Sequence, residues 1–152
     1  MGLLGRPPVL WCRAYADAMT RYVIDAPTLL DLVGSDLRVD PSHQLVAPNS
    51  IRSEALQLLL GDVRRGARAE QAALRTHEQI TELKMRLLGD RVSRSLAWRI
   101  ARQHDWATLR DAEYLAVARL QADALITIDP DLAAKADNVV PVARLQALLV
   151  GE

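Results

Sequence analysis

The feature that most constrains the fold is residues 21–30, where a short strand leads directly into an acid and then into a helix. Residues 22–24 (Tyr-Val-Ile) favour a strand, and Asp25 follows them at once. The apolar run that begins after Pro27 predicts a helix. Ligands of open α/β sheets bind at the carboxyl ends of the strands. We therefore expect Asp25 to stand at the edge of the sheet where a ligand would bind.

Strands and helices alternate along the rest of the chain, which predicts a parallel sheet. Further strands are expected at 44–47, at 124–129, where the run again ends in an acid, and at the sheet edge over 139–142, followed by a closing helix at 143–149. Residues 68–104 read as helical with no strand signal. The expected fold is a single α/β domain with a central parallel sheet, helices on both faces and an inserted helical hairpin.

Length and composition narrow the function classes. The 152 residues suffice for one domain with a real core, and the formal net charge of zero gives no whole-molecule field for nucleic acid or membrane. Cys12 is the only cysteine, so no disulfide framework or zinc cluster is expected, and a reducing, cytoplasmic setting is the default. No apolar run approaches membrane-spanning length. Residues 1–18, interrupted by glycines and prolines, are expected to be a mobile extension or an upstream start, with the domain at 19–150.

Four acids stand where the predicted fold would bring side chains together. Asp25 and Asp129 end predicted parallel strands, although a helix cap or a turn would explain either one. Glu54 lies within the apolar stripe of a predicted helix, where a carboxylate is costly without a partner, and a rim position reaching water is an equal alternative. Asp111 faces the same way as an apolar stripe, but its spacing from Thr108 also matches a capping box.

As a set, the four carboxylates predict a divalent-cation site. Without cations they would repel one another and shift one another's pKa values. Hard oxygen ligands are those that Mg²⁺ or Mn²⁺ prefers. One or two such ions can deprotonate water and stabilise both oxygens of an in-line phosphodiester displacement. The expected chemistry is metal-dependent phosphodiester hydrolysis.

The same stretches resemble the PIN-domain ribonucleases, and among them the VapC-type toxins of bacterial toxin–antitoxin pairs. The matching segments, in the family's order, are YVIDA (22–26), APNSIRSE (47–54), TLRDAEYLA (108–116) and LITIDPDL (125–132). The resemblance implies a Mg²⁺-dependent endoribonuclease whose catalytic and metal-binding residues are Asp25, Glu54, Asp111 and Asp129. It also implies a small antitoxin bound over the helical hairpin, and a homodimer.

Supporting groups are assigned partly from the same resemblance. It implies supporting roles for Thr127 and Asp131. Where the family often has a hydroxyl or amide residue two positions after the first acid, this chain has Pro27, and Thr28 is expected to be the substitute donor. Arg52 and Arg110 adjoin two of the acids and are candidates for contact with RNA phosphates, although neighbouring side chains on a helix point in different directions.

Three further interpretations stay open. The arginines of residues 91–102, together with Trp98, form either a solvated helix face, which we favour, or a surface for RNA or antitoxin. A catalytically silent PIN-like module that binds a protein or RNA is the main alternative to an enzyme. A nuclease that acts on DNA through the same acids is the other.

Overall fold

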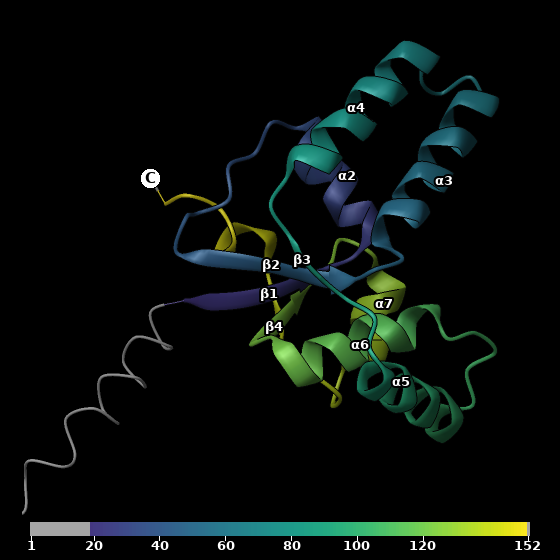
Figure 1. Cartoon of the computed structure of the whole chain (residues 1–152), viewed down its shortest axis with the longest axis vertical. Coiled ribbons are helices and arrows are strands. Elements are labelled where there is room, and N and C mark those ends of the chain that lie inside the picture. The colour runs from purple at the N-terminus through teal and green to yellow at the C-terminus, as the bar shows by residue number, and fades with distance from the viewer. Residues whose placement is uncertain (1–18, 152) are drawn as a thin grey trace, which may run out of the picture.

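The structure is a computed structural model, and it describes residues 19–151. The predicted N-terminal extension, residues 1–18, lies outside the described residues. The described chain forms a sheet with helices on both faces (Figure 1).

The sheet has five strands in the order β3-β2-β1-β4-β5, and all neighbouring pairs are parallel. The strands are β1 (Thr20–Ile24), β2 (His43–Pro48), β3 (Arg86–Leu88), β4 (Ala124–Ile126) and β5 (Val142–Ala143). The central strand β1 is thus the one identified first from the sequence. The prediction of an α/β fold with a parallel sheet is confirmed.

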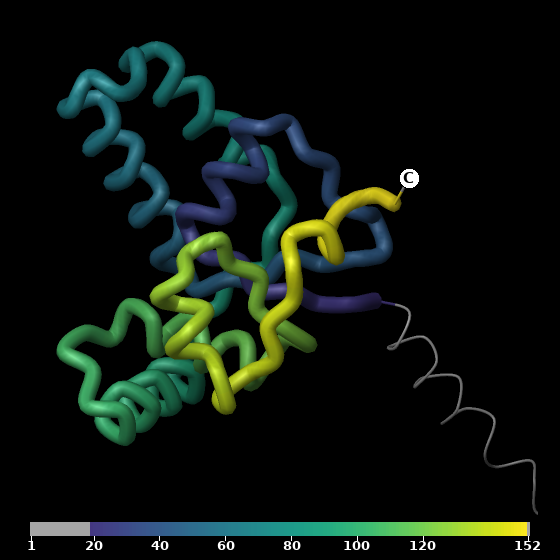
Figure 2. The backbone as a smooth tube through the Cα atoms, turned by 180° about the vertical axis from the view of Figure 1, so that it is seen from behind, coloured from purple at the N-terminus to yellow at the C-terminus, as the bar shows by residue number. Residues whose placement is uncertain are grey.

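Helices cover the sheet in two groups. One group, drawn above the sheet in Figure 1, contains α2 (Ala26–Gly34), α3 (Ile51–Arg64) and α4 (Glu70–Glu82). The other, drawn below it, contains α5 (Arg91–His104), α6 (Arg110–Gln121) and α7 (Pro130–Ala136). The C-terminal segment, with the 3-10 turn η2 (Leu145–Ala147), returns beside the loop before β2, where Val39 and Leu149 form a β-bridge (Figure 2).

The reading of 68–104 as wholly helical is wrong, because β3 lies within it and pairs with β2. A three-residue edge strand is too short for a two-residue period to show, and none of its residues is fully buried. The helical hairpin is formed instead by α3 and α4, which lie side by side (Figures 1 and 2). The expected closing helix at 143–149 is also wrong, since only the 3-10 turn forms there.

Helix α6 is the buried centre of the lower layer. It packs against β1, β2 and β4 on one side and against α5 on another. All residues from 114 to 118 are buried, and three of the buried side chains on this helix are alanines: Ala112, Ala116 and Ala118. Small side chains let the helix lie close to the sheet. Asp111, in the first turn of α6, is buried with the residues of this helix that face the sheet.

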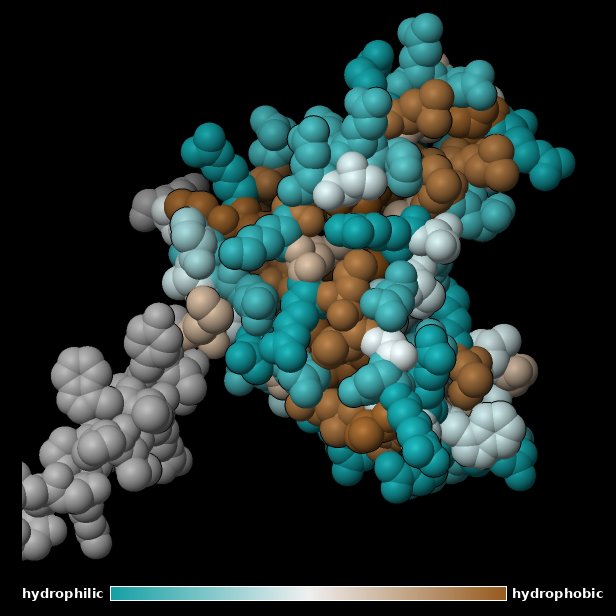
Figure 3. Space-filling model, viewed as in Figure 1, coloured by the Kyte–Doolittle hydropathy of each residue, from teal (hydrophilic) through white to brown (hydrophobic). Residues whose placement is uncertain are grey.

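The outer end of the α3–α4 hairpin carries an apolar surface. Leu56, Leu60 and Leu74 are exposed there, and Figure 3 shows apolar side chains gathered over these two helices. They line a groove of about 390 Å³ between α3 and α4. Among the helices described, none combines the length and apolarity needed to cross a bilayer.

Candidate active site

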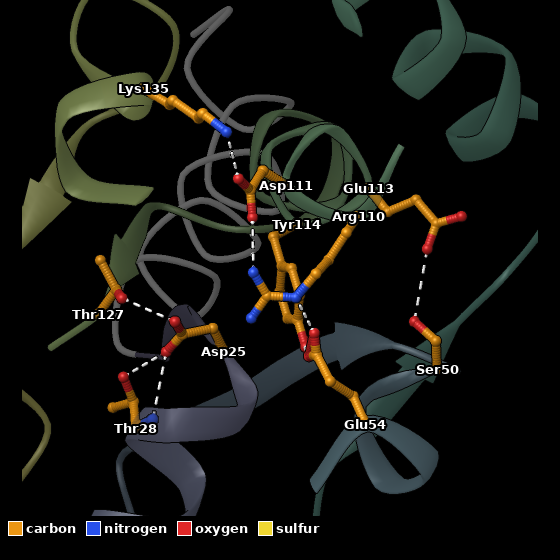
Figure 4. Close-up of polar contacts among 10 residues, drawn as sticks. All are labelled: Asp25, Thr28, Ser50, Glu54, Arg110, Asp111, Glu113, Tyr114, Thr127 and Lys135. Carbon is orange, nitrogen blue, oxygen red and sulfur yellow. Dashed lines mark hydrogen bonds and ion pairs between the residues drawn. The ribbon is translucent and has the colours of Figure 1, made fainter. Parts of the chain in front are cut away.

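Asp25 is fully buried at the carboxyl end of the central strand. It follows β1 directly and caps the N-terminus of α2, where one carboxylate oxygen, Oδ1, accepts the Thr28 backbone N–H at 3.3 Å and also the Thr28 hydroxyl. The second oxygen, Oδ2, accepts the Thr127 hydroxyl at 2.8 Å (Figure 4). Both threonines expected to support the site therefore contact Asp25.

Burial raises the pKa of the Asp25 carboxyl, because the charged form loses its hydration. The hydrogen bonds from Thr28 and Thr127 oppose this rise by stabilising the charged form, but burial outweighs them. A carboxyl group with a perturbed pKa at a sheet edge is typical of functional sites.

The loop after β4 is tied to α2 through the same two hydroxyl groups. The backbone N–H of Ile128 donates to Thr28 Oγ1, and that of Asp129 donates to Thr127 Oγ1, each at 3.0 Å. These contacts make both hydroxyls simultaneous donors and acceptors. Their effect is to hold the β4–α7 loop against Asp25.

Asp129 lies further from the strand end than the sequence pattern indicated. β4 ends at Ile126, which pairs with Ile24, so the residue level with Asp25 is Thr127. Asp129 is the N-cap of α7, and its side chain accepts the backbone N–H of Asp131 at 3.0 Å. Asp131 itself is exposed. The capping role weighed for Asp129 is thus present in the structure.

Glu54 and Asp111 come from the first turns of two different helices, α3 and α6, and share one cation. The guanidinium group of Arg110 donates through Nε to Glu54 and through Nη1 to Asp111, the latter at 3.1 Å (Figure 4). Burial lowers the pKa of Arg110, but the hydrogen bond and charge of Glu54 more than offset it, so the pKa is raised. Although neighbouring side chains on a helix leave it in different directions, the arginine side chain is long enough to reach the adjacent Asp111 carboxylate.

Asp111 is buried and also pairs with Lys135. The lysine reaches it from α7, with Nζ 2.6 Å from Oδ2, and the same ammonium group lies 5.2 Å from the centroid of the Trp106 ring. The capping-box explanation for Asp111 is wrong, since the N-cap of α6 is Leu109 and no side chain caps it. The contact with Lys135 joins residues from separate helices, and no local pattern in the sequence indicates it.

Tyr114 is a polar member of this cluster that the sequence reading assigned simply to the core. Its ring is buried, and its hydroxyl donates to Glu54 Oε2 at 2.5 Å. Burial, the hydrogen bond to Glu54 and the charges of Glu54 and Asp25 all raise the pKa of Tyr114, so the phenol stays protonated. Its spacing of three residues from Asp111 on one helix was the available signal, because such residues share a face.

The donor set fits a hard divalent cation in its chemistry, since Asp25, Glu54 and Asp111 offer carboxylate oxygens and a cation already bridges two of them. As the side chains stand within residues 19–151, no three acidic, histidine or cysteine groups are gathered closely enough to hold a metal ion. A metal would therefore need these side chains to exchange partners.

The other basic candidates are Arg52 and the arginines of α5. Arg52 is half-buried on α3, and its Nε is shielded from solvent without a hydrogen-bond partner among the described residues. The arginines of α5 are exposed, as is Trp98. This exposure agrees with the solvated helix face that we favoured. It does not test the alternative, a surface that binds RNA or antitoxin.

Comparisons with known proteins bear on the fold. No protein-family model matches the chain, and no curated protein matches it in sequence. Among solved structures, PAE2754 from Pyrobaculum aerophilum is similar with a TM-score of 0.64 and 22% identity, over 86% of this chain and 94% of that one. The VapBC-1 structure from nontypeable Haemophilus influenzae is similar with a TM-score of 0.55 and 16% identity, over 82% and 98%. At these identities the likeness is one of fold: the chain shares its α/β fold with these two structures, in agreement with the predicted PIN-like architecture.

Proposed function

We propose that this protein is a Mg²⁺-dependent endoribonuclease and the toxin of a toxin–antitoxin pair. One observation carries the proposal: Glu54 and Asp111, from two different helices, share Arg110, while Tyr114 donates to Glu54 and feels the charge of Asp25 at the carboxyl edge of the sheet. Mn²⁺ is the expected substitute for Mg²⁺. The similarity to VapBC-1 supports the toxin assignment at the level of fold.

In this proposal Asp25, Glu54, Asp111 and Asp129 hold the metal. Bound there, Mg²⁺ would activate water and neutralise charge that develops on the phosphodiester group. The chain's own residues prepare the site: Thr28 and Thr127 fix both oxygens of Asp25. Tyr114 fixes one oxygen of Glu54 from the buried side.

Arg52 and Arg110 are the basic groups placed to bind the RNA backbone. Both lie in the first turns of the helices that carry Glu54 and Asp111, and guanidinium groups suit phosphate oxygens. The Nε of Arg52 has no hydrogen-bond partner in the described chain, and because it is shielded from solvent, the side chain would have to turn outward for this atom to meet a phosphate. Asp131, exposed beside the Asp129 cap, remains a candidate supporting group.

The antitoxin is proposed to bind the α3–α4 hairpin. The sequence reading placed it over a helical hairpin, and the hairpin that the structure contains carries the apolar groove of Figure 3. Exposed apolar patches of this kind mark protein-binding surfaces. A homodimer is proposed as well, on the resemblance to VapC-type toxins.

A second candidate, the catalytically silent binding module, is favoured by a different observation. Glu54 and Asp111 already have Arg110 and Lys135 as partners, so these acids can be explained as structural ion pairs. In that case the cluster would stabilise the start of α6, and no metal would be needed.

RNA cleavage separates the two candidates. Purified full-length protein, free of antitoxin, is incubated with a panel of RNAs and with single-stranded DNA, in Mg²⁺, in Mn²⁺ and with chelator. Asp25→Asn and Asp129→Asn are compared with Asp137→Asn, an exposed aspartate after α7, and circular dichroism checks that each variant folds. Metal-dependent RNA cleavage lost in the first two variants and kept in the third supports the enzyme. Folded wild-type protein that cuts no RNA and binds no metal refutes it and favours the binding module.

A further inference from the structure

All four carboxylate oxygens of Glu54 and Asp111 are occupied by donors of the chain itself. Arg110 donates to one oxygen of each carboxylate, Tyr114 donates to the other oxygen of Glu54, and Lys135 to the other oxygen of Asp111 (Figure 4). A divalent cation needs such oxygens as ligands. An ion placed between the two carboxylates would need the space that the Arg110 side chain fills, and the positive guanidinium group would repel it.

Arg110 is the donor whose departure would free the most carboxylate oxygens, and its side chain is exposed to solvent. It alone contacts both carboxylates, and its side chain is 44% exposed, whereas those of Glu54 and Asp111 are 18% and 11% exposed. Tyr114 is only 1% exposed and cannot swing out, because its ring is packed in the core. Lys135 is placed over Trp106 and touches a single carboxylate.

We propose that Arg110 is an internal cation that occupies the metal position between Glu54 and Asp111 and must be displaced for a divalent ion to bind. The inference rests on the proposed function, because it concerns the same acids. It makes Arg110 a competitor built into the site: the guanidinium group keeps the two carboxylates paired in the metal-free protein. The apparent metal affinity of the wild-type chain is then lowered by this pairing.

Metal binding, measured without any substrate, tests the inference. Titration of the full chain with Mn²⁺, followed by calorimetry and by the electron paramagnetic resonance signal of free Mn²⁺, gives Kd for the wild type and for Arg110→Gln. Loss of a charge-assisted competitor is expected to tighten binding about tenfold. The matched control is Arg119→Gln, which removes the same charge from the exposed far end of α6, where no ion pair is found in the described chain.

The outcomes separate the inference from the proposed function. Tighter Mn²⁺ binding in Arg110→Gln, with Arg119→Gln unchanged, supports the competitor role. Equal or weaker binding in Arg110→Gln overturns it while leaving a metal-dependent enzyme intact. Absence of Mn²⁺ binding in the folded wild type and both variants overturns the inference and the proposed metal site together. If Arg110→Gln does not fold, Arg110→Lys decides. The lysine ammonium group lacks the planar fork with which the guanidinium group meets both carboxylates, so this variant should also bind Mn²⁺ more tightly than the wild type.

Discussion

Thr28→Val is expected to destabilise the protein through two hydrogen bonds while leaving the shape of the core unchanged. Thr28 is fully buried, and its hydroxyl donates to Asp25 and accepts the backbone N–H of Ile128 at 3.0 Å. Valine replaces this hydroxyl with a methyl group of similar volume. The substitution therefore removes a donor from a buried carboxylate and an acceptor from the β4–α7 loop without opening a cavity.

The size of the expected loss in stability follows from the two hydrogen-bond partners of the Thr28 hydroxyl. A hydrogen bond to a charged group contributes about 1.5–3 kcal/mol, and one to a neutral backbone group about 1 kcal/mol. Asp25 is fully buried, so water cannot replace the lost donor, whereas the Ile128 side chain is exposed and water can reach its N–H more easily. We expect the free energy of unfolding to fall by about 2–4 kcal/mol, most of it from the contact with Asp25.

Urea unfolding of metal-free protein at pH 7, followed by circular dichroism, measures this difference. Thr28→Ser is the matched control, because it keeps the hydroxyl and loses only a methyl group, and it is expected to lose about 1 kcal/mol. If Thr28→Val were within 0.5 kcal/mol of the wild type, or more stable than Thr28→Ser, the hydroxyl would not be supporting the Asp25 carboxylate and the reasoning would fail.

Two further perturbations address the same cluster. Because burial raises the pKa of Asp25 above its usual value of 3.8, the folded state binds this proton more tightly than the unfolded state, so the contribution of Asp25 to stability should decline as pH rises from about 3.8 through the raised pKa. Asp25→Asn should lack this contribution when the free energy of urea unfolding is measured across pH. If the free energies of unfolding of both proteins changed in parallel with pH, the raised pKa of Asp25 would not be the cause. Tyr114→Phe removes the buried donor to Glu54 and should lower the free energy of unfolding by about 1.5–3 kcal/mol; unchanged stability would mean that this hydrogen bond contributes nothing.

The sequence by itself determined the class of fold and the position of its central acid. Residues 22–24 are strand-favouring and run into Asp25 and then an apolar helix, and the alternation of such units restricts the chain to a parallel sheet. These are local signals, because the residues that carry them are neighbours in the chain. For the same reason Thr28 could be suspected of reaching Asp25, since both lie in one turn.

Only the tertiary structure decided how the acids are partnered. The residue level with Asp25, directly after β4, is Thr127 rather than Asp129, because strand register depends on where β4 pairs with β1. Arg110 joins Glu54 to Asp111, and Lys135 reaches Asp111 from another helix. Contacts between residues far apart in the chain follow from packing of whole elements, and a single sequence carries no local pattern for them.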